Sequence, residues 1–238
     1  MRSTDLPKVR ALRLFESMTE ERFGQLMNAA YLQTFPAQVE LITEGQPSDF
    51  LYIVMEGSVE LFARSNGRET VMQMLEPVRS FILAAVLKDA PYLMSARTCT
   101  SSRLLMIPSE NIRNAFRDDD GFARAIVEDL ANTYRGAIKE QKNLKLRTAV
   151  ERLANRLLQF HKENTKTDQS DSTGIFELPY GKRTLASLLG MTPENLSRAF
   201  NTLKPYGVEV KGAKIQLTDL PALRTLAKEN PLIDDPAT

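Results

Sequence analysis

The chain has 238 residues, of which 42% are apolar and 26% charged, and its formal net charge is +1. This composition is ordinary for a soluble globular protein, and the length suits two modest domains. No stretch approaches the roughly 20 uninterrupted apolar residues that span a bilayer, and the N-terminus lacks the apolar core of a signal peptide. The single cysteine, Cys99, cannot form an internal disulfide, so we expect a cytoplasmic protein.

The chain is expected to begin with short helices, for which Ser17 is the better N-cap because Glu20 follows three residues later. From about residue 30 to residue 108, short apolar runs alternate with turn residues, a spacing typical of an antiparallel sandwich or barrel. Asn66-Gly67 predicts a tight hairpin turn, because both residues accept positive φ angles. The predicted strands are Tyr31–Phe35, Val39–Ile42, Phe50–Met55, Ser58–Ala63, Thr70–Leu75, Ser80–Leu83, Arg97–Thr100 and Leu104–Ile107.

After Ser109 the apolar spacing changes from two to about 3.6 residues, which predicts a helix of about 27 residues. Its apolar stripe can pack on the preceding β-domain or pair with its twin in a two-stranded coil. The helix leads away from the sheet domain, so we favour a homodimer. A second helix, Thr148–His161, and a polar loop, Asn164–Gly174, follow. The expected dimer residues are Phe122, Ile126, Leu130 and Ile138.

The strongest signal in the chain is the segment Tyr180–Val208. Three leucines face inward on a short first helix, and Gly190 after them permits the positive φ that a tight turn between helices demands. Thr192 can cap the next helix, and Pro193 suits its first position. These features together predict a helix-turn-helix within about Lys182 to Arg198.

The second of these helices has a buried apolar face and an outward polar face, as major-groove reading requires. We expect Glu194, Ser197 and Arg198 to read base edges, with Arg198 as a bidentate donor to guanine. Val208–Lys211 and Lys214–Leu217 are predicted to form a small hairpin wing. The expected contacts to the DNA backbone are Lys182, Arg183, Thr192, Lys211 and Lys214.

These motifs give the chain a resemblance to the catabolite-activator and fumarate-nitrate regulator (Crp/Fnr) superfamily over almost its whole length. Gly45–Leu61 is similar to the family's cyclic-nucleotide-binding jelly roll, and the long helix to its dimerisation helix. Gly190–Arg198 resembles its recognition turn, closest to the fumarate-nitrate branch. The resemblance implies a homodimeric transcription regulator on double-stranded DNA, at a palindrome with TTG-type half-sites, with RNA polymerase as a partner.

The same resemblance implies an α+β fold in three parts. Residues 1–118 would form an N-terminal antiparallel β jelly roll that acts as the sensor domain. Residues 119–146 would form the long dimerisation helix, and residues 147–238 the winged helix-turn-helix domain.

Two departures from the family concern the cyclic nucleotide. In members that bind it, a Gly-Glu-Leu signature supplies a glutamate for the ribose, and an Arg-Ser pair takes the phosphate. The first window here is Leu83-Ala84-Ala85, and the second is Tyr92-Leu93 or Met94-Ser95, depending on one gap. Arg97 lies beyond the expected position. An unpaired phosphate in an apolar pocket is costly, so we do not expect cyclic AMP to bind through the usual contacts.

The expected effector pocket is therefore apolar, and either holds an apolar or aromatic metabolite or is filled by side chains. Its expected residues are Leu83, Ala84, Ala85, Tyr92, Met94 and Tyr134.

Other cofactors and classes are weighed by the residues available. An iron–sulfur cluster needs about four thiolates, which Cys99 alone cannot supply. The only histidine, His161, is expected on a helix surface, so no metal site is predicted and haem lacks a signature. A catalytic jelly roll needs clustered histidines and carboxylates, so an enzyme is disfavoured. The alternative is a ligand- or haem-binding jelly-roll sensor whose effector, a metabolite or a gas, controls DNA binding.

Overall fold

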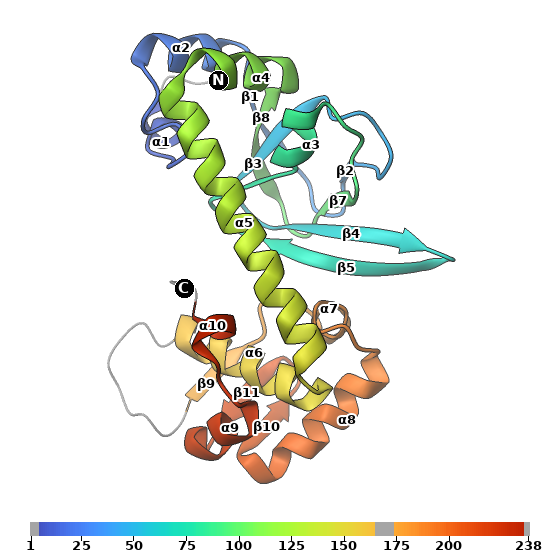
Figure 1. Ribbon diagram of the computed structural model, residues 1–238. Helices are drawn as coiled ribbons and strands as arrows, with labels where there is room; N and C mark the ends of the chain where they lie inside the picture. The colour runs from blue at the N-terminus through green and yellow to red at the C-terminus, as the bar shows by residue number, and fades with distance from the viewer. Residues whose placement is uncertain (1–4, 165–173, 236–238) are drawn as a thin grey trace. The chain divides into compact units, whose positions relative to one another are not determined.

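The computed structural model describes residues 5–164 and 174–235, and the chain divides into two compact units, Met1–Tyr134 and Arg135–Thr238. Figure 1 follows the elements in chain order. The strands of the first unit are β1 (Tyr31–Phe35), β2 (Glu40–Ile42), β3 (Phe50–Glu56), β4 (Val59–Ser65), β5 (Arg68–Leu75), β6 (Arg79–Phe81), β7 (Ser95–Thr98) and β8 (Ser102–Pro108). Its helices are α1 (Leu6–Arg10), α2 (Glu20–Asn28), α3 (Leu83–Lys88), α4 (Ser109–Asp118) and the start of α5 (Asp120–Leu146).

The eight strands form two antiparallel sheets, with strand orders β1-β8-β3-β6 and β2-β7-β4-β5. Each of the eight predicted strands overlaps an observed one, which confirms the predicted antiparallel β-domain. The predicted tight turn joins β4 to β5, where Asn66 and Gly67 have φ angles of 51° and 72°. The hairpin closes on the pair Ser65 and Arg68 and projects from its sheet (Figure 1).

The β1-β8-β3-β6 sheet is apolar on both faces, and alternation along β3 and β8 divides its residues between two cores. Tyr52, Val54 and Leu104 pack between the two sheets. Leu51 and Leu105 point the other way, into a core formed with the N-terminal helices, α4 and α5. Because both faces are covered, these strands read as nearly continuous apolar runs.

Two local expectations were wrong. Thr19, not Ser17, caps α2: its hydroxyl accepts from the Arg22 amide at 3.4 Å, while its own amide donates to Asp119 at the start of α5. The expected strand Ser80–Leu83 is shorter, because Ile82 adopts a positive φ of 60° and α3 begins at Leu83.

The second unit contains the rest of α5, then α6 (Ala149–Asn164), β9 (Gly174–Glu177), α7 (Lys182–Leu188) and α8 (Pro193–Leu203). A short 3-10 turn, β10 (Val208–Lys211), β11 (Lys214–Leu217), α9 (Leu220–Ala227) and α10 (Pro231–Asp234) follow. The predicted wing hairpin is β10 and β11, and β9 adds a third strand to it that the sequence did not indicate. The expected loop at residues 165–173 lies outside the described residues.

We predict that Asp119→Ala lowers the free energy of unfolding by about 1–3 kcal/mol, because it leaves the buried Phe122 amide and the partly buried Thr19 amide without an acceptor. Asp119 Oδ1 accepts from Phe122 at 2.8 Å and Oδ2 from Thr19 at 3.1 Å, which joins the first turn of α5 to the N-terminal helices. Urea unfolding followed by circular dichroism measures the loss. Asp118→Ala is the matched control: among the described residues, that half-exposed carboxylate pairs only with Arg22, at 3.7 Å. An equal loss in both variants would contradict the prediction.

Candidate functional site

The helix-turn-helix predicted between Lys182 and Arg198 is formed by α7 and α8. Gly190, with a φ of +61°, occupies the turn between them, and a β-carbon there would also meet Leu144 at 3.0 Å. Thr192 is the N-cap of α8 and accepts from the Asn195 amide at 3.3 Å. Each of these local features was expected from the sequence.

Helix α8 separates its side chains into two faces. Leu196, Ala199, Phe200 and Leu203 are buried in the core of the second unit. The three expected base-reading residues, Glu194, Ser197 and Arg198, are all exposed. The pKa of Glu194 is lowered by its own backbone amide, then by the Thr192 hydroxyl and by Arg198. The exposed face therefore presents an anion, a hydroxyl and a cation at positions i, i+3 and i+4 of the helix.

The expected backbone-contacting residues are also exposed. Lys182 and Arg183 lie in the first turn of α7, with Lys182 Nζ 5.8 Å from the centroid of the Phe200 ring. Lys211 and Lys214 lie at the tip of the wing, and each approaches an acid, Glu209 at 3.8 Å and Glu177 at 3.9 Å. Exposed ion pairs of this kind contribute little, so they do not hold the lysines away from a phosphate.

Two arginines that were not predicted as functional residues, Arg147 and Arg152, connect the helix-turn-helix to neighbouring segments of the second unit. Arg152 on α6 donates to the Leu189 carbonyl at 2.8 Å and to the Arg147 carbonyl at 2.7 Å. Arg147, between α5 and α6, forms a buried bidentate pair with Asp234 on α10, at 2.7 and 2.6 Å. These contacts join the turn after α7 to the α5–α6 junction and to α10.

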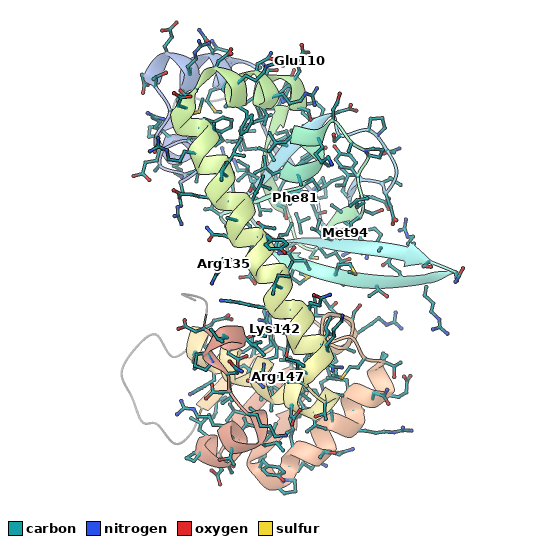
Figure 2. All side chains as sticks on the ribbon, in the orientation of Figure 1. Phe81, Met94, Glu110, Arg135, Lys142 and Arg147 are labelled. Carbon is teal, nitrogen blue, oxygen red and sulfur yellow. The ribbon has the colours of Figure 1, made fainter. Side chains whose placement is uncertain are left out.

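The interior between the two sheets of the first unit contains some of the residues that were expected to line an effector pocket. Tyr52 and Phe81 stack there with ring centroids 5.3 Å apart, beside buried Tyr92 (Figure 2 labels Phe81 and Met94). Burial, followed by Tyr92 and Asp49, raises the pKa of Tyr52 to about 12, so its hydroxyl stays neutral.

The six expected pocket residues do not all line this interior. Tyr92, Met94 and Ala85 pack there. Leu83 instead belongs to the core on the other side of the β1-β8-β3-β6 sheet. Ala84 is exposed, and Tyr134 is 68% exposed.

The polar residues nearest the expected phosphate position are engaged within the sheets. The Ser95 hydroxyl is buried and accepts from the Glu44 amide at 3.0 Å. Arg97 donates to Glu60 and to Glu69, in each case at 2.8 Å, and lies 4.6 Å from the centroid of the Phe62 ring. The positive charge of Arg97 is therefore matched by two carboxylates.

The residues of α5 that were expected to form the dimer interface are not the apolar residues that the helix exposes. Phe122 and Ile126 are fully buried in their own chain, where the Phe122 ring stacks on Phe15 at 6.0 Å. Leu130 is half-buried against the same core, and Ile138 is 39% exposed. The most exposed apolar residues on the helix are Val127, Tyr134 and Leu146.

Cys99 and His161, the residues weighed above as cofactor ligands, are both at least partly buried. Burial raises the pKa of Cys99 to about 11, so the thiol stays protonated near neutral pH. The expectation that His161 lies on the surface was wrong: it is 8% exposed, and a β-carbon on Gly174 would come within 2.2 Å of its Nδ1. Burial and Arg224 lower its pKa. Among the described residues no group of three metal-ligating side chains occurs, and no helix is long and apolar enough to cross a membrane.

Comparison with known proteins agrees with this architecture. The family model of the cyclic nucleotide-binding domain matches residues 32–119, and that of the Crp-like helix-turn-helix domain matches residues 151–226. The chain belongs to the Crp/Fnr superfamily of transcription regulators. It is 22% identical to a CRP-like cAMP-activated global transcriptional regulator of Mycobacterium tuberculosis, over 90% of this chain and 96% of the relative.

Solved structures show the same fold as this Crp/Fnr chain. FixK2 from Bradyrhizobium japonicum is 24% identical, with a TM-score of 0.69 over 84% of this chain and 98% of that one. A protein assigned to the Crp/Fnr family from Eubacterium rectale is 17% identical, with a TM-score of 0.73 over 92% and 99%. The predicted combination of jelly roll, long helix and DNA-binding helix-turn-helix is confirmed.

We predict that Asp234→Ala destabilises this Crp/Fnr chain by about 3–5 kcal/mol, because it leaves the Arg147 guanidinium buried without a counter-charge. The double variant Arg147→Met/Asp234→Leu should recover most of that loss, since an apolar pair removes the desolvation cost of both ions. Urea unfolding followed by circular dichroism distinguishes the two. A double variant as unstable as Asp234→Ala would contradict this account.

The same pair predicts a pH dependence. Burial alone would raise the pKa of Asp234, but Arg147 and the Asn230 amide outweigh it, so the pKa is lowered. The stabilisation is therefore present above the unfolded pKa of about 4 and is lost as pH falls through the folded pKa.

Proposed function

We propose that this regulator is a homodimer that recognises a DNA palindrome with TTG-type half-sites, one half-site per subunit. The observation that carries the proposal is the polar face of α8, where Glu194, Ser197 and Arg198 are exposed above a fully apolar buried face. A recognition helix of this kind reads base edges with side chains near its N-terminus. Lys182, Arg183 and the wing lysines supply phosphate contacts that fix its register.

Arg198 is assigned to guanine, because its guanidinium can donate to O6 and N7 together. Arg198→Ala should remove about 1–3 kcal/mol of discrimination at one guanine and leave weak, salt-sensitive binding. Lys182→Ala is the comparison: it should weaken all sequences about equally and lower the salt slope by about one. Fluorescence anisotropy on the palindrome and on its guanine-substituted versions measures both. If Arg198→Ala discriminates between these sequences as the parent does, the assignment fails.

For the dimer, we propose the face of α5 that carries Val127, Leu130, Tyr134 and Ala137. Their spacing of three and four residues is that of the a and d positions of a coiled coil, and Gln141 and Leu144 continue it. Val127 is 58% and Tyr134 is 68% exposed, although large apolar side chains at such spacing are normally covered. This face replaces Phe122 and Ile126, which are buried within their own chain.

Tyr134→Glu should shift the protein to monomers, because a twofold interface would bury two like charges face to face. Asn132→Glu is the matched control: it adds the same charge at an exposed position two residues away, on the opposite side of the heptad. Sedimentation equilibrium measures the mass of each variant. A dimer that persists in Tyr134→Glu would exclude this face.

The sensor domain is proposed to work without the usual cyclic AMP contacts. Its support is that Arg97 is paired with Glu60 and Glu69, and that Ser95 accepts from the Glu44 amide. An effector would then act by binding the sensor domain more tightly in one orientation of the DNA-binding domain than in another. RNA polymerase is the proposed partner at the promoter, and no catalytic role is assigned.

A further inference from the structure

A cavity lies in the first unit, away from the interior between the two sheets. It has a volume of about 230 Å³ and is bordered by α1, β1, β3 and β8. Leu32 and Met55 in its wall pack with the core formed by the N-terminal helices, on the opposite face of the β1-β8-β3-β6 sheet from Tyr52 and Tyr92. We call it the Asp5 cavity.

Asp5 carries one unsatisfied oxygen at this cavity. Its side chain is 9% exposed, and Oδ1 lies 2.7 Å from the Arg103 guanidinium, which also approaches Glu56 at 3.5 Å. Asp5 Oδ2 is buried and has no hydrogen-bond partner among the described residues. Asp5 lines the cavity, and a buried carboxylate oxygen without a donor is costly, so a rotation of its side chain would bring that oxygen to a donor in the cavity.

The other lining groups limit what that donor can be. Lys8 is exposed at the cavity, and no ion pair or hydrogen bond engages it within the described parts of the chain. Asp5 would repel a simple anion, and Lys8 would repel a simple cation. A zwitterion satisfies both charges. Leu12, Leu32 and Met55 leave an apolar wall beside these charges, which suits an alkyl group better than a cluster of water molecules.

We propose that the Asp5 cavity binds a free α-amino acid with an aliphatic side chain. The ammonium group donates to the Asp5 carboxylate, the carboxylate of the ligand pairs with Lys8, and the alkyl group contacts Leu12, Leu32 and Met55. The cavity is smaller than the roughly 300–1,000 Å³ of sites for drug-sized ligands, as a ligand of amino-acid size requires. This site is independent of DNA binding by α8.

The test is isothermal titration of the full chain with leucine and with methionine. One molecule per chain is expected to bind. 4-Methylpentanoate, which lacks the ammonium group, and 3-methylbutylamine, which lacks the carboxylate, should each bind at least about tenfold more weakly than leucine.

Variants locate the site. Asp5→Asn and Lys8→Met should each weaken leucine binding at least about tenfold, while Lys88→Met, the same change on the exposed surface of α3, should leave it unaltered. Lys8→Met keeps the test valid if Asp5→Asn impairs folding, because Lys8 is exposed and makes no described contact. Absence of amino-acid binding up to millimolar concentration, or equal binding in the parent and Lys8→Met, would overturn the proposal and leave the cavity to water.

Discussion

The buried pair between Arg147 and Asp234 fixes the base of the DNA-binding unit. Burying either charge without the other would be costly. The pair therefore links α10 to the α5–α6 junction. The carbonyl of Arg147 also accepts from Arg152, which in turn donates to Leu189 at the end of α7. Hydrogen bonds therefore connect the turn before α8, the α5–α6 junction and α10. The placement of α8 within this unit therefore depends on contacts among α6, α7, α10 and the α5–α6 junction.

The first unit has the fold of a cyclic nucleotide-binding domain, and its polar side chains contact one another. The two sheets and the helix after β6 have the arrangement of a cyclic nucleotide-binding domain, and the family model matches them. The polar groups near the expected phosphate position serve the sheets instead: Ser95 holds the Glu44 amide, and Arg97 links Glu60 to Glu69 across neighbouring strands. Function depends on site residues and not on the fold that carries them. The same sheet bears a different polar pocket on its other face, at Asp5 and Arg103.

Local signals in the sequence were sufficient where the neighbouring residues alone decide the backbone. Asn66-Gly67 determined the β4–β5 turn, and Thr192-Pro193 determined the start of α8. The expectations that were wrong involve distant partners. Thr19 caps α2 because Asp119, 100 residues later, holds its amide. His161 is buried because Gly174 closes over it, and the third wing strand exists because β9 pairs with β11.

By itself, the sequence determined the strands of the first unit, the helix-turn-helix and the polar face of α8, because these follow from periodicity and from caps within a few residues. It also predicts that the usual cyclic nucleotide contacts are missing. Tertiary structure alone decided which residues of the 27-residue helix α5 remain exposed. An apolar stripe of period 3.6 predicts that one helix face is covered, but it does not distinguish cover by the same chain from cover by a partner. Phe122 and Ile126 are covered by their own chain, and Val127 and Tyr134 are not. Contacts such as that between Asp5 and Arg103 join residues far apart in the chain, and only folding brings those charges into one cavity.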